Sequence, residues 1–378
     1  MTTELQQLAQ RCQTWLQSAA LPRWRRSYDP ERRLFAEGIS AEQQPYCDDF
    51  VRFRVQSRQI YVFAHATELD LVREPKLIVD GLAGLEAFKH ASGGYQFALG
   101  GNDGYLSEQV NTYEQAFALM AFSWGYAITS DVYYLEQMEY LYNWLETHLA
   151  DPLGGGYFTA LNQQDTRDQN PHMHLFEALL CCYQHTGHTR WLDRADHLYV
   201  LFRCKFLQSG HLTEFYDRDW SPNSQLSIRV DPGHHYEWIW LLNRYQRLCG
   251  IDVSKPISQL YQFASLFGHN RNGLVRDEIL SNGNELRSTS RLWCQTEYLK
   301  AAIVLWERDP CRECRQVICQ AVSMIFDYYL DPAPAPGLWI DQVDEMGKPV
   351  ERNSPASSFY HLFLAFAELI RIANKGAL

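Results

Sequence analysis

The stretch DPGHHYEWIWLL, residues 231–242, combines groups that can move protons with a large aromatic surface. Pro232 suits the first turn of a helix, and His234 and Glu237 then lie three residues apart on one helix face. An imidazole takes up and returns protons near neutral pH, and a neighbouring carboxylate orients it or raises its basicity. Two imidazoles that face each other across a pocket suit the removal and return of a proton at carbon.

Similar clusters of polar and aromatic residues recur in five other segments. They are Arg54 and Arg58 in RFRVQSRQIYVFAHA, Tyr113 in NTYEQAFALMAF, His174 and Glu177 in NPHMHLFEALL, Trp293 and Glu297 in RLWCQTEYLKAA, and Tyr360 and His361 in SSFYHLFLAFAEL. Proton abstraction beside a carbonyl creates an enediolate, whose oxygen needs a donor or a cation such as Arg58. The rings of Tyr113, Trp293 and Trp339 suit the apolar faces of sugars. Each residue alone is more often a core or salt-bridge residue, so the functional interpretation rests on the repetition.

Helical periodicity indicates the elements that carry these clusters. It predicts helices at about 4–19, 48–68, 73–91, 109–128, 131–149, 171–186, 189–206, 233–249, 254–268, 288–307, 310–330 and 355–373. Short connections alternate with long ones, and a short connection makes an antiparallel helix pair. The pattern predicts an all-α fold of six helical hairpins in a ring, an (α/α)6 barrel. An open superhelical array of helix pairs is the alternative.

The clusters fall on every second helix, and in four of the six they lie near its N-terminal end. In a ring of hairpins these ends share one face, so we expect one pocket there, roofed by the long connections. Several long connections alternate apolar and polar residues before an N-G, N-D-G or M-G turn, which predicts short β-hairpins. The chain has no Pro/Ser-rich linker, so residues 1–378 are expected to form a single catalytic domain.

Composition narrows the class of protein. The net charge of −11 and the absence of a basic run argue against nucleic acid and anionic membranes as partners. The N-terminus lacks the features of a signal peptide, and no apolar run looks long enough to span a bilayer, so a soluble cytoplasmic protein is expected. The ten Cys form no disulfide framework, and CRECRQVIC lacks the second CxxC of a zinc ribbon. We expect reduced, structural thiols.

Three rival interpretations remain open at this point. His174-x-x-Glu177 and His234-x-x-Glu237 have the spacing of metal ligands in helical bundles, but no partner Glu pair is found on the first two cluster-bearing helices. A glycoside hydrolase needs two carboxylates, and no pair is singled out among Asp231, Glu237, Glu297 and Asp341. The third rival is a non-enzymatic helical scaffold with an acidic, aromatic binding face.

The motifs taken together resemble those of the N-acylglucosamine 2-epimerase superfamily, most closely its D-mannose isomerase branch. The motifs are VQSRQIYVFA, NPHMHLFEALL, DPGHHYEWIWLL, RLWCQTEYLKA, GLWIDQVDEMGKPV and SSFYHLFLAFAEL, in that order along nearly the whole chain. The resemblance implies an (α/α)6 barrel that catalyses aldose–ketose isomerisation or 2-epimerisation without a cofactor or a metal.

The resemblance also implies roles for individual residues. His361 in FYHL is expected to take the proton from carbon 2. His234 in PGHxxE is expected to assist ring opening and to transfer a proton, supported by Glu237. The remaining residues are expected to bind the sugar, with the first two holding the oxygens at carbons 1 and 2: Arg58, His174, Tyr113, Trp293, Glu297 and Trp339.

The expected reaction is the interconversion of D-mannose and D-fructose through a cis-enediolate, with a monosaccharide as the only partner. The alternative is a 2-epimerase of the mannose/glucose, cellobiose or N-acylglucosamine type. Two departures from the family pattern bear on the substrate: Glu114-Gln115 stands where many members have His after the Tyr, and Trp293-Cys294 stands where two Trp are common. No extra basic cluster favours a phosphorylated sugar. The oligomeric state and the anomer preference do not follow from the sequence.

Overall fold

The computed structural model describes residues 4–47, 50–100, 108–208 and 210–375. The contacts group the chain into two compact units. Unit 1 comprises Met1–Ser27, Gly38–Tyr46 and Arg229–Leu378. Unit 2 comprises Tyr28–Glu37 and Cys47–Ile228. Each unit is built from helix pairs with a core of its own.

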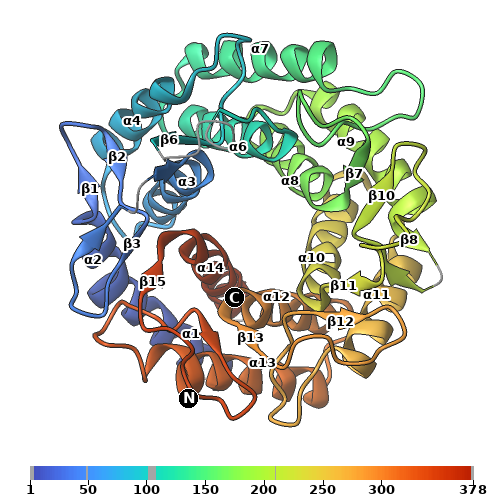
Figure 1. Ribbon diagram of the computed structural model, residues 1–378. Coiled ribbons are helices and arrows are strands. Elements are labelled where there is room, and N and C mark those ends of the chain that lie inside the picture. The colour runs from blue at the N-terminus through green and yellow to red at the C-terminus, as the bar shows by residue number, and fades with distance from the viewer. Residues whose placement is uncertain (1–3, 48–49, 101–107, 209, 376–378) are drawn as a thin grey trace. The chain divides into compact units, whose positions relative to one another are not determined.

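Unit 2 contains three antiparallel helix pairs. They are α3 (Phe53–Glu68) with α4 (Pro75–Gly84), α6 (Thr112–Thr129) with α7 (Val132–His148), and α8 (Gln169–Thr186) with α9 (Thr189–Leu201). Within the unit, α6 packs between α3 and α8, so these three helices form one row. Their partners α4, α7 and α9 form a second row beside the first (Figure 1). We call α3, α6 and α8 the inner helices of unit 2.

Unit 1 is organised in the same way. Its pairs are α10 (Pro232–Cys249) with α11 (Ser254–Phe267), α12 (Leu292–Arg308) with α13 (Arg312–Ile325), and α14 (Phe359–Lys375) with α1 (Glu4–Trp15), which continues through a π-helical turn into α2 (Leu21–Arg25). Here α12 packs between α10 and α14, the other inner helices. Every segment predicted as helical therefore contains a helix.

Local signals in the sequence set the helix ends. Asn111 caps α6 by accepting the backbone N–H of Glu114, and Asp131 caps α7 in the same way through Tyr133. Gly250 ends α10 with a φ of 78°, a left-handed conformation that glycine adopts without steric cost.

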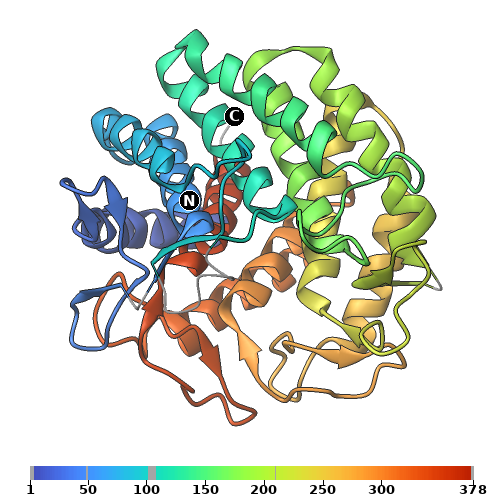
Figure 2. The same ribbon diagram turned by 45° about the horizontal axis from the view of Figure 1, so that its top comes forward.

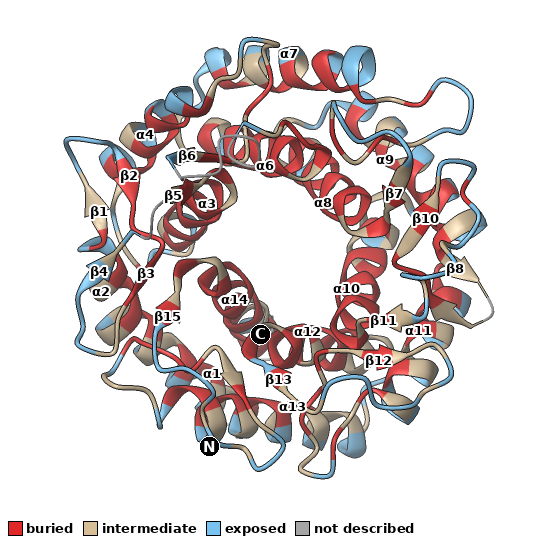
Figure 3. Cartoon of the chain, in the orientation of Figure 1, coloured by how far each residue is buried: buried red, intermediate tan, exposed pale blue. Residues whose placement is uncertain are grey.

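Burial separates inner from outer helices. The inner helix α6 is buried on almost every side along AFALMAFSWG, because that run is apolar around the whole helix. The outer helix α13 buries Ile318, Ala321, Val322 and Ile325, which share one face, and exposes the other side (Figure 3). The sequence of each helix thus decides whether it lies in the inner or the outer row of its unit.

One segment differs from the sequence-based expectation about membranes. Residues Ala356–Asn374, which include most of α14, are long and apolar enough to cross a bilayer by length and composition. However, 83% of this apolar stretch is buried inside the molecule, as in the core helix of a soluble protein. The apolar character of α14 is explained by its position among α1 and α12.

Several long connections fold back on themselves, but the hairpins formed by their strands do not contain the N-G or M-G turns on which the prediction rested. Those turns are closed by isolated bridges: His269 with Val275, Ile279 with Glu285, and Val343 with Pro349. The local hairpins are β1 (Tyr28–Asp29) with β2 (Leu34–Phe35), β3 (Gly38–Ile39) with β4 (Pro45–Tyr46), and β8 (Leu207–Gln208) with β9 (His211–Leu212). The hairpin expected around the N-D-G turn falls on 101–107, which lie outside the described residues.

Other strands pair between different long connections, which the sequence analysis did not predict. The antiparallel pairs are β5 (Phe50–Arg52) with β6 (Ala98–Gly100), β7 (Thr166–Asp168) with β10 (Phe215–Asp217), β11 (Arg229–Val230) with β12 (Ile279–Leu280), β13 (Ser290–Arg291) with β14 (Gln342–Val343), and β15 (Ser354–Pro355) with β3. In unit 1 the strands lie at one end of the helices (Figure 2). Because β5, β7, β11 and β13 run directly into inner helices, the pairing fixes where those helices begin.

A repeated glutamine contact ties inner helices to the long connections. In three of them a Gln amide bonds both backbone groups of a single loop residue: Gln56 with Phe35, Gln115 with Tyr95, and Gln295 with Val275. For Gln115 both bonds are 2.8 Å long. The amide offers one acceptor and two donors, so it satisfies a buried loop N–H and C=O together. These residues hold the ends of the helices on which the site residues lie.

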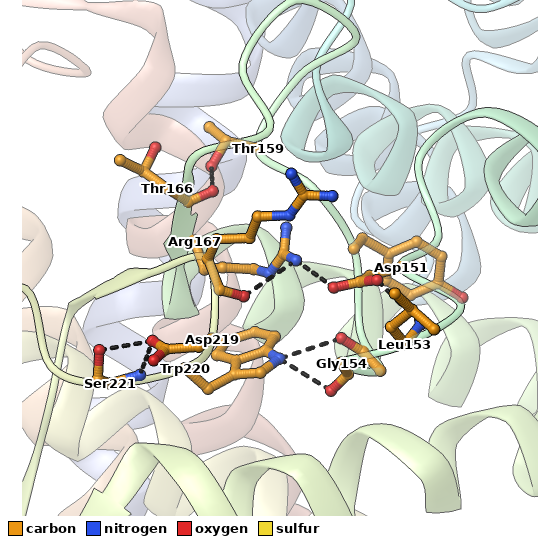
Figure 4. Close-up of polar contacts among 12 residues, drawn as sticks. Asp151, Leu153, Gly154, Thr159, Thr166, Arg167, Asp219, Trp220 and Ser221 are labelled. Carbon is orange, nitrogen blue, oxygen red and sulfur yellow. Dashed lines mark hydrogen bonds and ion pairs between the residues drawn. The ribbon is translucent and has the colours of Figure 1, made fainter.

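In unit 2, a buried ion pair lies within the long connection between α7 and α8, and a hydrogen bond from the same arginine reaches the connection after α9. The Arg167 guanidinium donates to the Asp151 carboxylate and, at 3.3 Å, to the Arg218 carbonyl (Figure 4). Beside this pair the Trp220 indole N–H donates to the Gly154 carbonyl at 3.0 Å. The side chains of Arg167 and Asp151 are both buried, so each charge depends on the other for compensation.

Candidate active site

In unit 1, the imidazole of His361 is held by a carboxylate. His361 lies in the first turn of α14, and its Nδ1 is 2.8 Å from Oε1 of Glu297 on α12. An ionised carboxylate only accepts hydrogen bonds, so the neutral imidazole carries its proton on Nδ1. Nε2 is then the unprotonated nitrogen of the ring. The sequence analysis singled out both residues but did not predict that they pair.

Glu297 lies behind His361 rather than on a surface that a substrate reaches. Its side chain is fully buried, and its second oxygen, Oε2, is 2.7 Å from Nζ of Lys300, which is also fully buried. Glu237 of α10 belongs to the same cluster, since one oxygen from each carboxylate and a nitrogen of His361 lie within 4.8 Å of one another. The expectation that Glu297 binds the sugar directly is therefore corrected: it supports an imidazole.

The second imidazole of unit 1, His234, lies in the first turn of α10. Its Nδ1 is 3.6 Å from the carboxylate of Asp231, the residue just before the helix. Its ring centre is 5.3 Å from that of Trp293, which in turn lies 5.6 Å from the ring of His361. The indole thus contacts both imidazoles. A Cβ on Gly233 would come within 2.6 Å of this indole, which explains the glycine before His234.

The two adjacent histidines of α10 point to different neighbours. The ring of His235 stacks on Phe263 of α11 with centres 5.2 Å apart, and its Nδ1 lies 3.2 Å from the Asp231 carbonyl. His235 is thus a core residue between paired helices. His234 instead faces α12 through Trp293. That His234 is the site residue of the two stays a prediction.

Trp339 does not lie where the sequence analysis expected it. The side chain is 0% exposed and stacks on Trp24 with ring centres 4.6 Å apart. Phe359 packs on it at 5.3 Å. The structure therefore corrects the expectation of a sugar-binding ring: Trp339 is a core residue of unit 1. No signal in the sequence distinguishes a core tryptophan from a sugar-binding tryptophan when the residue lies in a Gly-rich connection.

The carboxylate of Asp341, a candidate for a glycosidase mechanism, has a structural partner. It accepts a hydrogen bond from the Ser358 hydroxyl, in the 3-10 turn that leads into α14. Burial raises its pKa, and the Ser358 hydrogen bond opposes this effect. Asp341 therefore helps to position the start of the helix that carries His361.

In unit 2, Arg58 is held close to an aromatic pair. Its Nη2 donates to the Tyr113 hydroxyl at 2.7 Å, and its guanidinium carbon lies 4.5 Å from the centre of the Phe117 ring. Arg58 lies in the second turn of α3 and Tyr113 in the first turn of α6. A guanidinium keeps its charge at any physiological pH, so this arrangement offers a cation and a hydroxyl side by side.

A second arginine of α3 forms a buried ion pair that sequence reasoning did not find. Arg54 Nε donates to the Glu114 carboxylate at 2.7 Å, and its guanidinium lies 4.3 Å from the centre of the Tyr113 ring. Burial alone would lower the pKa of Arg54, but the charge and hydrogen bond of Glu114, together with the Tyr113 and Glu37 side chains, outweigh it and raise that pKa. Gln115 bonds the backbone of Tyr95. Both residues at which this chain departs from the family pattern, Glu114 and Gln115, therefore have structural partners.

His174 repeats the imidazole–carboxylate arrangement within unit 2. Its Nδ1 lies 3.2 Å from Oε2 of Glu177, one turn later on α8. Its ring packs against Tyr113 and Phe117, with centres 5.0 and 4.8 Å away. The His-x-x-Glu spacing, which also suits metal ligands, serves here to orient the imidazole. In the neutral imidazole Nε2 is then the acceptor nitrogen, which suits a hydrogen bond from a substrate hydroxyl.

Each unit thus presents a different chemical capability. Unit 1 carries two imidazoles, one of them with its tautomer set by a carboxylate, and these suit proton transfer. Unit 2 carries a guanidinium, a phenol and an oriented imidazole, which suit binding of hydroxyl and carbonyl oxygens and of developing negative charge.

Comparisons with known proteins agree in pointing to one family. The family profile described as N-acylglucosamine 2-epimerase matches residues 34–365. A protein of Rhizobium meliloti (strain 1021) named mannose-6-phosphate isomerase is 34% identical over 376 residues, which cover 94% of this chain and 95% of the relative.

Two solved structures share the fold. A D-mannose isomerase has a TM-score of 0.83 at 23% identity, covering 92% of this chain and 93% of its own. The cellobiose 2-epimerase from Spirochaeta thermophila has a TM-score of 0.85 at 21% identity, covering 99% and 98%. These likenesses confirm the predicted fold class, the (α/α)6 barrel.

Proposed function

Because the chain belongs to the N-acylglucosamine 2-epimerase family, we propose that it is an aldose–ketose isomerase that interconverts D-mannose and D-fructose. The observation that carries the proposal is the 2.8 Å contact between His361 Nδ1 and Glu297 Oε1. In the neutral imidazole this contact places the proton on Nδ1, so Nε2 is the unprotonated nitrogen that a base at carbon requires. The names of the similar isomerases support the choice of a mannose-type sugar.

The reaction begins with ring opening, in which His234 moves the proton of the anomeric hydroxyl to the ring oxygen as the bond between carbon 1 and the ring oxygen breaks. Nε2 of His361 then takes the proton from carbon 2 of the open aldose. The electron pair of that C–H bond forms the double bond between carbons 1 and 2, and the oxygen on carbon 1 becomes an enediolate oxygen. Arg58 stabilises this negative charge by donating hydrogen bonds, and Nε2 of the neutral His174 accepts a hydrogen bond from a sugar hydroxyl.

The second half of the isomerisation returns the same proton. The proton of the hydroxyl on carbon 2 moves to the enediolate oxygen on carbon 1, so that carbon 2 becomes the ketone and carbon 1 carries a hydroxyl. His361 delivers its proton to carbon 1 on the face from which it came. Only one base acts at carbon, and the intermediate is a cis-enediolate. The imidazole ends in its starting state, with its proton on Nδ1 and hydrogen-bonded to Glu297.

A 2-epimerase is the second candidate, and one observation favours it. The Trp293 indole contacts both His234 and His361, so the two imidazoles of unit 1 flank a single ring. In an epimerase, one imidazole removes the proton from carbon 2 and the other returns a proton to the opposite face. The product would then be the 2-epimer of the aldose rather than a ketose.

The deciding experiment is incubation with D-mannose in deuterated water, followed by NMR of the products. Fructose as the product supports the proposal, with deuterium at carbon 1 in those molecules for which the His361 proton exchanged with solvent before its return. Glucose labelled at carbon 2 supports the epimerase. Mannose 6-phosphate, glucose, lyxose and cellobiose are tested in parallel. Turnover of mannose 6-phosphate without turnover of mannose overturns the choice of a free sugar. A protein that converts none of these sugars would rule out the whole proposal.

Substitutions test the two imidazoles in the same assay. His361→Asn and His234→Asn should each lower the rate by about 10² or more if the residues transfer protons. His197→Asn, on the exposed side of α9, is the control and should leave the rate unchanged. A near-normal rate in either test variant would remove that imidazole from the mechanism.

A further inference from the structure

Lys300 is an ammonium group with no exposed surface. It lies on α12, one turn after Glu297, and its side chain and that of Glu297 are both 0% exposed. Its Nζ is 2.7 Å from Oε2 of Glu297 and 4.3 Å from the centre of the Trp240 ring on α10. A lysine is almost never fully buried without a paired charge, because desolvation of the ammonium costs several kcal/mol.

The neighbours of Lys300 form a short chain of charges. Glu297 uses Oε1 for His361 Nδ1 and Oε2 for Lys300 Nζ, so one carboxylate joins the imidazole to the ammonium. Glu237 brings a second carboxylate within 4.8 Å of this carboxylate and imidazole. Two buried carboxylates so close together repel each other and favour proton uptake, whereas a cation beside them opposes it.

We propose that Lys300 is a positioning residue that keeps Glu297 ionised and thereby keeps His361 neutral, with its proton on Nδ1, in the resting enzyme. The inference rests on the proposed function for its catalytic consequence, but not for its effect on His361. Without the ammonium, the Glu297–His361 pair binds one more proton at higher pH. That proton either occupies Nε2 of His361 or neutralises Glu297, and both outcomes remove the base in its working form.

The charges that face His361 within unit 1 come from two elements. Glu297 and Lys300 belong to α12, and Glu237 belongs to α10. His234 of α10 also faces it, through the ring of Trp293. All of these groups remain in place in a Lys300 variant, so the only charge removed is the ammonium.

Charged groups on the other elements that pack against α14 have partners of their own. Arg11 of α1 is largely exposed and lies 3.2 Å from Asp331. Asp341, which precedes α14, accepts from the Ser358 hydroxyl. Neither changes when Lys300 is replaced.

The test measures the protonation of His361 directly. Nitrogen-15 labelled histidine gives imidazole NMR signals whose shifts report the tautomer and the charge, and the signal absent from His361→Gln identifies His361. In Lys300→Met, which keeps the aliphatic stem, the titration midpoint of this signal should rise by about one pH unit or more. In Lys300→Arg, which keeps the charge, it should stay near the wild-type midpoint.

Kinetics supply a second readout on the same variants. The acidic limb of the kcat/KM profile should move to higher pH in Lys300→Met by the same interval as the NMR midpoint, and return in Lys300→Arg. A loss of packing alone would lower the rate equally at every pH. Lys300→Gln, a polar neutral side chain, takes the place of Lys300→Met if that variant does not fold, and the same shift is expected.

The outcomes separate this inference from the proposed function. An unchanged midpoint and tautomer of His361 in both neutral variants would overturn the role of Lys300, whatever sugar the enzyme converts. A raised midpoint supports it even if mannose is not the substrate, because the NMR signal does not depend on turnover. A midpoint raised as much in Lys300→Arg as in Lys300→Met would also count against it, since the charge would not be the cause.

Discussion

At the scale of single residues, the chemistry of this protein depends on which carboxylate holds which imidazole. Glu297 holds His361 and Glu177 holds His174, each through Nδ1, so in the neutral form each ring carries its lone pair on Nε2. The pair expected from sequence was His234 with Glu237, because their spacing is helical. The carboxylate found at 3.6 Å from His234 is that of Asp231. Spacing identifies residues on one face but does not identify the hydrogen bond that a side chain makes.

Two tryptophans expected to bind sugar can be separated by a matched pair of substitutions. Trp339→Ala should lower the free energy of unfolding by about 3–5 kcal/mol, because it opens a cavity in the core, and should leave KM nearly unchanged. Trp293→Ala should mainly reduce kcat/KM, because Trp293 is partly exposed and contacts both imidazoles of unit 1. Urea denaturation and steady-state kinetics measure both. A stable Trp339→Ala with a raised KM would show that this ring contacts the sugar.

At the scale of elements, the structure depends on contacts that fix the beginning of each inner helix. In α8 this contact is made by His172, whose Nε2 accepts the Tyr157 backbone N–H at 2.9 Å and whose Nδ1 lies 2.8 Å from the Asp168 carbonyl. Only a neutral imidazole with its proton on Nδ1 makes both bonds. Burial lowers the pKa of His172 to about 4, which keeps it neutral. Imidazole and glutamine thus play the same part on different helices.

This contact predicts how stability changes with pH. The folded-state pKa of about 4 lies below the ordinary value of 6.5, so the unfolded chain binds this proton more tightly. The stabilisation is complete above about pH 6.5 and is lost as the pH falls towards 4, by up to about 3 kcal/mol. In His172→Gln that part of the pH dependence should disappear. Urea denaturation at pH 7, 5.5 and 4.5 measures it.

His197→Gln serves as the control for this prediction. His197 is exposed on α9, so its replacement should leave the acid-dependent loss of stability as in the wild type. An equally steep loss in His172→Gln would show that other groups cause it.

At the scale of the whole molecule, the two ends of the chain meet within unit 1. The first helix, α1, packs against the last, α14, and Trp15 contacts Phe366 edge to face at 6.0 Å. In α2, Trp24 stacks on Trp339, and its indole N–H donates to the Gly337 carbonyl at 3.0 Å. Because α14 carries His361, the N-terminal segment supports a residue of the candidate site that lies at the other end of the sequence.

Removal of residues 1–27 should therefore expose the apolar face of α14. The truncated protein is expected to lose cooperative unfolding and to aggregate, as seen by size-exclusion chromatography and near-UV circular dichroism. As a milder test, Trp24→Ala should cost about 3–5 kcal/mol, whereas Arg25→Ala, at an exposed neighbour, should cost little. A truncated protein that is soluble, well packed and active would disprove this role.

The sequence alone was sufficient for the features that local signals specify. Periodicity and capping residues predicted the helices, and the alternation of short and long connections predicted their pairing and the (α/α)6 class. The position of a residue in its helix was also predictable, so His234, His361 and Tyr113 lie in first turns as expected. Each of these inferences uses residues that are close together in the chain.

Only the tertiary structure decided which distant residues meet. His361 and Glu297 are 64 positions apart, and strands of different long connections pair without any local pattern that links them. The burial of Trp339 and the position of Lys300 beside Glu297 depend on how neighbouring helices pack. The amino-acid sequence of one helix does not specify that packing. The physical reason is that a short-range pattern fixes a backbone element, whereas protonation and burial depend on every element around it.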